Sequence, residues 1–333
     1  MKPLKIAMVS VAHIHAADFC GDIARLSGNG APYAIWDDDP ARGTSFAARF
    51  RCPFVSDLNA ILADPEVDAF AICAENAKHV PILRRVLPVG RPTFCEKPLG
   101  VTSEEADEIA VLVARHGTPL VSGYFQPFSA GNRGAVALVA SGSIGRATHW
   151  FFRNAHHAAY GHWFDTPELA WFTNPALAGG GALLDMGTHA VHLLRHFAGP
   201  VREVWATKSN LSGIWSQVDD WGVIEMRFAS GAVGRIEAGW CFAGAPVGLQ
   251  IVGSKGSLFD DGRGKLVWRA PDETPRPVPE ADSRPDRMAR LVALVRGELS
   301  SDEVAEDLNA SLDAVRIMDA AYRSCASGRW TAL

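Results

Sequence analysis

The amino-acid sequence predicts an α/β fold in two parts: a doubly wound parallel sheet, followed by an α+β domain with a large, mostly antiparallel open sheet. Two observations support this prediction. Short apolar runs alternate with helical patterns through the first third of the chain, which is typical of a parallel sheet covered by helices. From residue 201 to residue 268, short strand patterns follow one another across tight turns, which indicates antiparallel pairing. The pattern changes after residue 122, so we expect domains at 1–122 and 123–333.

The first part starts with residues 4–11, a near-continuous apolar run that predicts a strand buried on both faces. Further strands are expected at 33–39, 67–74 and 92–100. Helical patterns lie between and after them, at 16–26, 40–50, 56–64, 79–90 and 102–117. Their starts carry the usual signals, namely Pro40 in a first turn, Ser56 as an N-cap, and Thr102 or Ser103 ahead of acidic residues. This alternation predicts a Rossmann-type domain.

The second part opens with a helix at 131–141, a long irregular stretch and a helix at 181–197. Strand patterns then occupy 201–268, the fourth of them starting at residue 246. Residues 271–286 are too rich in proline for regular structure, so we expect a surface loop there. Two more helices and a short tail complete the chain.

Composition limits the partners. The formal charge is −5 and the pI is about 6.1, so a basic surface for nucleic acid or an anionic membrane is not expected. The sequence has no apolar run long enough to span a membrane. The six cysteines form no C-x-x-C pair, and three of them lie in apolar runs like reduced core thiols. We therefore expect a cytoplasmic protein.

The segment MVSVAHIHAADF at residues 8–19 lies where a dinucleotide fold carries G-x-G-x-x-G, but Ser10, Ala12 and His15 take the three glycine positions. Serine and alanine are small enough to let the backbone approach a pyrophosphate. His15 is too large for close packing, so we expect it, like His13, to turn outward over the cofactor. An ordinary strand–helix turn is the alternative.

Asp37 ends the second expected strand, where a carboxylate can bind both ribose hydroxyls of a dinucleotide. Asp38 and Asp39 follow, and three carboxylates would repel a 2′-phosphate, which favours NAD over NADP. Arg42 is the residue that argues otherwise. A solvated acidic turn is the alternative reading.

The motif FCEKPLG at residues 94–100 places Glu96, Lys97 and Pro98 at the carboxyl edge of the sheet, where open α/β folds bind ligands. A partly desolvated lysine there can donate to a substrate hydroxyl or carbonyl oxygen. Pro98 stiffens the turn and is a candidate for a cis bond.

In the segment GGGALLDMGTHAVHLLRHFAG at residues 179–199, three glycines allow close approach at the start of a helix. The positions Asp185, His189, His192 and His196 form one polar stripe on this helix. A carboxylate one turn before a histidine can set its tautomer and raise its basicity, which makes His189 a candidate general base. A histidine in a purely structural role is the alternative.

Seven of the eleven histidines lie between residues 149 and 196, but without the spacing of a known metal motif. We expect no metal. Hydrogen bonds from His156, His157 or His162 to a polyhydroxylated or anionic substrate are the favoured role. Three tryptophans lie nearby, Trp150, Trp163 and Trp171. Each could stack on the apolar face of a sugar, and packing against the sheet is an equal alternative.

These motifs resemble the Gfo/Idh/MocA family, which includes glucose–fructose oxidoreductase and inositol dehydrogenase. The similarity spans the chain, from DPEVDAFAICAENAKHV at 64–80 to SGSIGRA, GSKGSLF and MDAAYRSCASGRW. It implies a nicotinamide-dependent oxidoreductase acting on a sugar, cyclitol or related polyol, with Lys97, Asp185 and His189 as catalytic residues. The chain departs from the family in its glycine-free turn, in His192 where an aspartate is common, and in GYFQPF, where Gln126 and Pro127 stand in place of an arginine. These last two positions face the substrate in relatives, so the substrate itself is not transferred.

The expected cofactor-binding residues are Ser10, Ala12, His13, Ile14, His15, Asp37, Arg42, Ala74, Asn76, His79, Glu96 and Lys97. The expected substrate-binding residues are Lys97, Gln126, His156, His157, Trp163, Asp185, His189 and His192. The function we expect is that of a dehydrogenase that transfers a hydride between nicotinamide and a secondary alcohol. The alternative is a redox-neutral sugar enzyme such as an oxidative glycosidase, lyase or epimerase, and a non-catalytic sensor of sugar or NAD is less favoured, because the triad is intact. By analogy with the family, a homodimer or homotetramer is expected.

Overall fold

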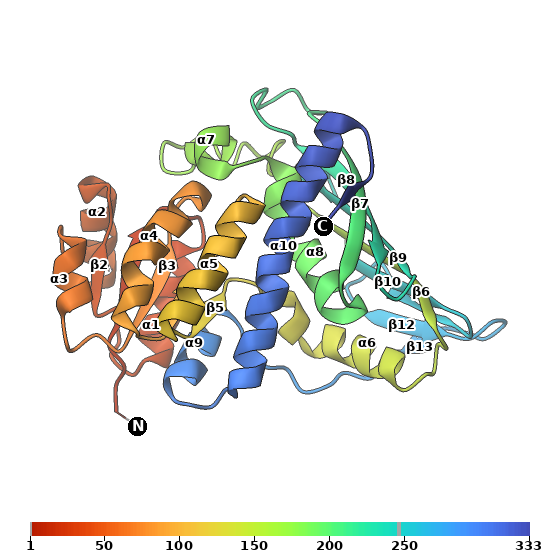
Figure 1. The fold of residues 1–333 in the computed structure, drawn as a ribbon, viewed down its shortest axis with the longest axis horizontal. Coiled ribbons are helices and arrows are strands. Elements are labelled where there is room, and N and C mark those ends of the chain that lie inside the picture. Colours follow the sequence, from red (N-terminus) through yellow and green to blue (C-terminus); the bar gives the residue numbers. More distant parts are fainter. Residues whose placement is uncertain (1, 245–247) are drawn as a thin grey trace.

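The computed structural model describes residues 2–244 and 248–333, and it contains a five-stranded and a nine-stranded sheet side by side (Figure 1). The first sheet is parallel in the order β2-β1-β3-β4-β5. Its strands are β1 (Ile6–Val11), β2 (Ala34–Trp36), β3 (Ala69–Cys73), β4 (Thr93–Cys95) and β5 (Leu120–Ser122). The predicted Rossmann-type sheet is confirmed, and its strand order reverses beside β1, where such folds bind ligands.

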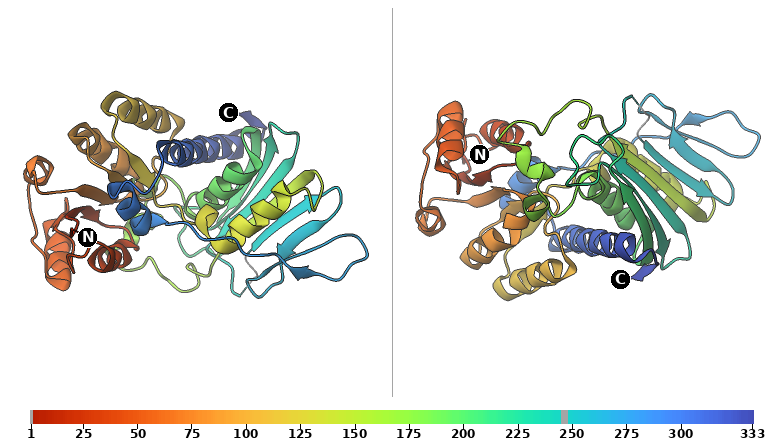
Figure 2. Two further views of the ribbon diagram at one scale, coloured as in Figure 1. Left: turned by 90° about the horizontal axis from the view of Figure 1, so that it is seen from below. Right: turned by 90° about the horizontal axis from the view of Figure 1, so that it is seen from above.

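Helices cover both faces of this sheet (Figure 2). They are α1 (Ala16–Leu26), α2 (Pro40–Phe50), α3 (Leu58–Ala63), α4 (His79–Val86) and α5 (Ser103–His116), with the short 3₁₀ turns η1 (Asn76–Lys78) and η2 (Leu87–Val89). Thr102 caps α5 through a bond from the Glu105 N–H, as expected. The prediction for α3 was wrong by one residue: Asp57, and not Ser56, accepts the N-cap bond, from the Asn59 N–H.

The second sheet has the order β13-β12-β11-β10-β6-β9-β8-β7-β14. Its strands are β6 (Ala147–Ala155), β7 (Val201–Ser209), β8 (Trp221–Phe228), β9 (Val233–Gly239), β10 (Gly248–Gly253), β11 (Ser257–Asp260), β12 (Leu266–Arg269), β13 (Arg276–Pro277) and β14 (Thr331–Ala332). All of its pairs are antiparallel except β6 with β9, so the mostly antiparallel prediction is confirmed. Residues 246 and 247 of the expected fourth strand lie outside the described residues. The predicted loop at 271–286 contains only the two-residue β13.

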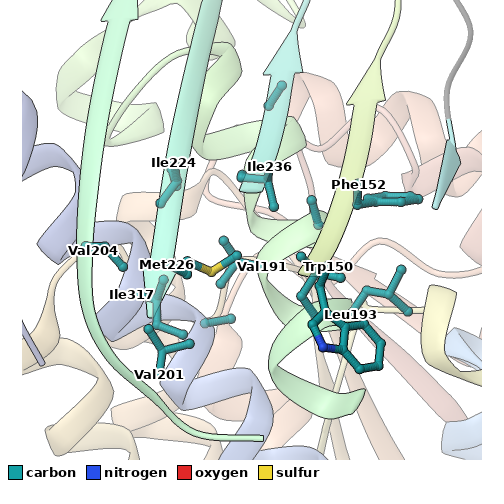
Figure 3. Packing of buried hydrophobic residues seen from close by; sticks show 14 of the residues in the cluster. Trp150, Phe152, Val191, Leu193, Val201, Val204, Ile224, Met226, Ile236 and Ile317 are labelled. Atoms are coloured by element: carbon teal, nitrogen blue, oxygen red, sulfur yellow. The ribbon is translucent and has the colours of Figure 1, made fainter. Parts of the chain in front are cut away.

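One face of the second sheet carries α6 (Ala130–Ala140), α8 (Ala182–Ala198) and α10 (Ser301–Ser327), as Figure 2 shows. The core between them is apolar and includes Val191 of α8, Ile224 of β8, Ile236 of β9 and Ile317 of α10 (Figure 3). The short elements η3 (Gln126–Phe128), η4 (Ala170–Thr173) and α7 (Pro175–Ala178) lie in the connections before α8. No helix in the described part of the chain is long and apolar enough to cross a membrane.

The last two helices return to the first sheet. Met288 and Leu291 of α9 (Arg287–Val295) share a buried cluster with β1 and α1, and Leu312 of α10 lies in the cluster beneath α5. The boundary between residues 122 and 123 stays a prediction. Any division of the chain has to allow for this return of the C-terminal helices.

The glycines before α8 allow close backbone packing. A Cβ on Gly181 would lie 2.0 Å from the carbonyl oxygen of Asp219, so only glycine fits there. Asp219 in turn accepts bonds from the first backbone N–H groups of α8, through its carbonyl from Ala182 and through its carboxylate from Leu183 at 2.8 Å. The close approach expected at these glycines is therefore the contact between Gly181 and Asp219, the residue that caps α8.

The substitution Gly181→Ala is expected to destabilise the protein by about 2–3 kcal/mol, because the backbone must shift away from Asp219 and weaken the cap of α8. Urea denaturation followed by circular dichroism measures this. Gly131→Ala is the matched control, since its Cβ meets nothing within 4 Å inside α6, and it should be neutral or slightly stabilising. Equal midpoints for the two variants would contradict the packing argument.

Candidate active site

A cavity of about 350 Å³ lies between the carboxyl edge of the first sheet and the N-terminal half of α8. The predicted residues that line it are His13, Ile14, His15, Lys97, His156, Trp163, Asp185 and His189. Residues that the sequence analysis did not single out also line it, namely Asp18, Phe125, Asn154, Phe164, Phe172 and Met186. The cavity thus brings together Lys97 from the first part of the molecule and Asp185 and His189 from the second.

Lys97 and Asp185 form a buried ion pair across the two parts. The Lys97 ammonium lies 2.6 Å from Asp185 Oδ1, and the Trp240 indole donates to Oδ2 at 3.0 Å. Burial alone raises the pKa of the Asp185 carboxyl, but Lys97, followed by His156 and Trp240, outweighs it, so the net pKa lies well below its ordinary value. Lys97 is followed by a cis peptide bond to Pro98, as expected.

His189 does not have the partner that the sequence predicted. Both oxygens of Asp185 are engaged by Lys97 and Trp240, while His189 Nδ1 has no hydrogen-bond partner in the structure. The prediction that Asp185 orients His189 by a direct bond was therefore wrong. Burial lowers the pKa of His189 well below its ordinary value, and Lys97 adds to this, so the imidazole is neutral near pH 7 and is a weaker base than the sequence analysis expected.

The glycine-free turn keeps a glycine-like backbone. Ser10 has φ of +67°, a left-handed conformation that is unfavourable for a residue with a side chain. Its hydroxyl donates to Asp37 at 3.1 Å, and the Val11 N–H donates to the same carboxylate at 2.7 Å. These two bonds hold the turn in the shape that glycine would adopt freely.

The two histidines of the turn lie side by side, with 4.7 Å between ring centroids, but differ in exposure. His15 is partly exposed and lines the cavity. His13 also lines the cavity but is buried, with its ring 5.8 Å from that of Trp171 and 5.1 Å from that of Phe172. The Trp171 indole donates to the Ala12 carbonyl at 3.1 Å. Segment 170–173 of the second part therefore rests directly on the turn.

At the end of β2, Asp37 is held by Arg42, whose guanidinium lies 2.7 Å from Oδ1. Burial raises the pKa of the Asp37 carboxyl although Arg42 and Val11 oppose it. Arg42 also pairs with Asp38 and Glu75, and Lys78 pairs with the same two carboxylates. Three carboxylates and two cations thus form one network at the expected adenosine end of the site.

Three further predicted cofactor residues are tied into the fold beside this network. The ring nitrogens of His79 lie 2.8 Å from the Pro98 carbonyl and 3.2 Å from the Ala74 carbonyl, which links the ends of β3 and β4. The Asn76 amide donates to the Ala178 carbonyl of α7 at 2.8 Å. These residues position the edge of the sheet and its contact with the second part.

Three predicted substrate residues do not line the cavity. His192 is fully buried, stacks on Tyr124 and lies 3.7 Å from Asp307, so it belongs to the core between α8 and α10. Gln126 lies in η3, and His157 is exposed beside Trp163. The reason is geometric for His192: it lies one turn beyond His189, past the end of the cavity. We do not propose these three for substrate binding.

The residues missed by the sequence analysis are mostly aromatic or apolar groups in irregular segments. Phe172 and Phe164 stack at 4.5 Å between ring centroids, and Trp240 follows β9 directly. Trp240 could have been identified from the sequence, because it directly follows a predicted strand, where side chains at the sheet edge can reach a site. Trp150, by contrast, packs in the core, so of the three tryptophans weighed for stacking only Trp163 lines the cavity.

Buried imidazoles predict a loss of stability in mild acid. Burial lowers the pKa of His13, His79, His156, His189, His192 and His196, the last of these to about 4. Below the ordinary pKa of about 6.5 the unfolded chain binds protons that the folded chain does not, so stability falls as the pH falls.

Urea midpoints between about pH 7.5 and about pH 5.5 should therefore decrease, and His196→Gln should reduce the slope. His162→Gln, at an exposed histidine beside Asp165, should leave it unchanged. A midpoint independent of pH for the unmodified protein would refute this account.

Comparison with known proteins gives two family matches. Residues 4–124 match the oxidoreductase family with an NAD-binding Rossmann fold, and residues 133–259 match the GFO/IDH/MocA C-terminal domain. A 1,5-anhydro-D-fructose reductase from Ensifer adhaerens is 25% identical over 264 residues, covering 76% of this chain and 77% of the relative. An inositol 2-dehydrogenase from Acidothermus cellulolyticus is 27% identical over 252 residues, covering 74% and 69%.

Among solved structures, an inositol dehydrogenase homolog complexed with NAD⁺ from Azotobacter vinelandii has a TM-score of 0.84 at 21% identity, covering 100% of this chain and 98% of that one. At this identity the match supports the fold alone. Together with the family matches, it confirms the resemblance read from the motifs. The chain belongs to the Gfo/Idh/MocA family of oxidoreductases, with an NAD-binding Rossmann domain followed by the C-terminal domain of that family.

Proposed function

We propose that the protein is a dehydrogenase that transfers a hydride between nicotinamide and a secondary alcohol of a sugar, cyclitol or related polyol. The observation that carries this proposal is the meeting of Lys97 and His189 on one cavity, with Asp185 paired to the lysine. The names of the relatives, an anhydrofructose reductase and an inositol dehydrogenase, support the class of substrate.

The residues present fit a nicotinamide dinucleotide at both ends. Ser10 gives the turn the positive φ that a pyrophosphate-binding turn requires, and His15 and Ile14 border the cavity beside it. Asp37 stands at the end of β2, where a ribose binds, and its oxygens accept from Arg42. Ribose hydroxyls are donors as well, so they can take over those acceptor positions when Arg42 turns aside.

When bound, the nicotinamide supplies the hydride acceptor, and the chain supplies orientation and proton transfer. Lys97 is a cationic donor held in place by Asp185, suited to a substrate oxygen at which negative charge develops. Neutral His189 accepts the hydroxyl proton, since its buried imidazole has the lone pair free. Phe125 lies 5.3 Å from the His189 ring and, with Phe172, limits the access of water.

The lining also supports a polyhydroxylated substrate. The ring of Trp163 is stacked on His156 at 4.7 Å and offers an apolar face to a sugar ring. Asn154 donates to the Met186 carbonyl at 2.8 Å and so is fixed at the wall of the cavity. Its amide oxygen remains as an acceptor for substrate hydroxyls.

We propose NAD as the preferred cofactor. Asp37, Asp38 and Glu75 give the adenosine end three carboxylates against the two cations Arg42 and Lys78, a balance that disfavours a 2′-phosphate. A cytoplasmic location and a homodimer or homotetramer remain part of the proposal, the latter by analogy with the family.

Asp38→Ala should strengthen NADP binding several-fold and leave NAD binding nearly unchanged, because it removes an exposed carboxylate from the 2′-phosphate side. Dissociation constants from isothermal titration calorimetry measure both cofactors. Glu66→Ala, which removes a carboxylate paired with Lys5 elsewhere on the surface, should change neither. An unaltered ratio in Asp38→Ala would argue against the charge balance.

Lys97→Met and His189→Gln should each lower kcat by about 10²–10⁴-fold, because each removes a group that handles charge or a proton at the reacting oxygen. The assay is the near-ultraviolet absorbance of reduced nicotinamide with a panel of polyols and sugars. Lys5→Met is the matched control, since Lys5 pairs with Glu66 far from the cavity. Full activity in either variant would remove the proposed mechanism.

The same assay separates the other two functions. A redox-neutral enzyme would release product with catalytic amounts of NAD and no net change in absorbance. A sensor would bind NAD or sugar without turnover. Either result with the unmodified protein would replace the dehydrogenase proposal.

A further inference from the structure

Three side chains that were expected beside the cofactor converge on one point to which the dehydrogenase proposal gives no catalytic role. One possible ligand atom from each of His13, His15 and Glu96 lies within 4.8 Å of the others. His15 Nδ1 lies 3.0 Å from Glu96 Oε1, and His13 Nε2 lies 4.0 Å from the same oxygen. The two histidines come from the turn after β1, and the glutamate follows β4.

This cluster contains buried polar atoms that lack partners. The Glu96 side chain is 0% exposed, and its Oε2 has no hydrogen-bond partner within the described residues. His13 Nε2 is buried and also without a partner. A buried carboxylate needs a compensating positive charge. Lys97, the next residue in the chain, is already paired with Asp185.

The hydrogen bond between His15 and Glu96 accounts for only part of this arrangement. One proton on His15 satisfies one carboxylate oxygen and leaves Glu96 Oε2 and His13 Nε2 unsatisfied. His13 Nδ1 accepts a bond from the His15 N–H at 3.2 Å, so this imidazole carries no proton on Nδ1 and is neutral. A neutral imidazole cannot supply the missing charge, but it is the form that ligates metals.

Two imidazoles and one carboxylate are a common donor set for divalent transition metals in catalytic sites. Such a set leaves coordination positions open, and here they would face the cavity, because His13 and His15 line it beside Lys97 and His189. The rings of Trp171 and Phe172 cover the other side of His13. An apolar shell of this kind controls solvent access to a metal.

We propose that His13, His15 and Glu96 bind a divalent transition-metal ion, such as Zn²⁺, Fe²⁺ or Co²⁺, whose open positions take a hydroxyl or carbonyl oxygen of the substrate. This proposal departs from the expectation that the protein binds no metal. The site also lies outside the histidine-rich segment 149–196, where a metal was weighed from the sequence. For His13 Nε2 to bind the metal, the imidazole proton would have to move from Nε2 to Nδ1, and Nδ1 would lose the bond that it accepts from the His15 N–H at 3.2 Å.

Titration with Co²⁺ alone tests the site, because the visible absorption of Co²⁺ reports its coordination. The full chain is first treated with a chelator and dialysed. We expect one equivalent of Co²⁺ to bind, with visible bands of imidazole and carboxylate coordination, and Zn²⁺ to displace it. X-ray absorption of the Zn²⁺-loaded protein should show two imidazole ligands.

His15→Ala and Glu96→Gln should each weaken Co²⁺ binding by at least about 100-fold, since even groups that only orient metal ligands are worth about 10- to 100-fold. His162→Ala is the matched control, because His162 and Asp165 form an exposed histidine–carboxylate pair at 2.8 Å. Circular dichroism melting identifies any variant that fails to fold. Glu96→Gln keeps the shape of the side chain, so at least one informative variant is expected to fold.

The proposal is overturned if the unmodified protein binds less than one equivalent of Co²⁺. It is equally overturned if Glu96→Gln or His15→Ala binds Co²⁺ as tightly as His162→Ala, or if the X-ray absorption shows no imidazole ligands. NAD binding and turnover are measured on the same preparations. A failure of the metal proposal is thereby distinguished from a failure of the proposed dehydrogenase function.

Discussion

The buried ion pair between Lys97 and Asp185 is the interaction on which the geometry of the site depends. It joins the end of β4 to the first turn of α8, so it fixes the distance between the two parts of the molecule at the cavity. Removing one partner of a buried pair typically costs about 3–5 kcal/mol, because the other charge stays buried. The position of Asp185 depends in turn on the cap that Asp219 gives α8, and on Gly181, which lets Asp219 approach.

The electrostatics of the cavity follow from its enclosure. Lys97 compensates Asp185, while the imidazoles around them are kept neutral by burial. Glu96 adds a further negative charge below the cavity, so the site as a whole favours a cationic occupant. The nicotinamide and metal proposals meet at His15, which both of them use, and separate measurements decide them, namely NAD binding and turnover for the first and Co²⁺ binding for the second.

Much of the fold could be predicted from the sequence, because apolar periodicity and turn residues are local signals. The strands of the first sheet and the positions of Lys97, Asp185 and His189 are examples. Partners that lie far apart along the chain could not be predicted. Nothing local shows that Trp240 bonds Asp185, or that Trp171 reaches the turn after β1.

The errors have the same origin. His192 shares a helix face with His189, but the length of the cavity, set by elements distant in the sequence, decides which of them reaches it. His13 and His15 both line the cavity, but Trp171 and Phe172, which are distant in sequence, pack against His13, which is buried, while His15 is partly exposed. Pattern alone therefore identified the right helix and the right turn, and tertiary packing selected the side chains within them.

The left-handed backbone of Ser10 has a consequence for how nucleotide-binding chains are identified. A glycine at this point is one solution to a conformational requirement, and a serine anchored to a neighbouring carboxylate is another. A fingerprint written in glycines passes over proteins that use the second solution. A fingerprint defined by the backbone dihedral angles of the turn, together with the carboxylate that anchors it, would include both glycine-containing and serine-containing turns.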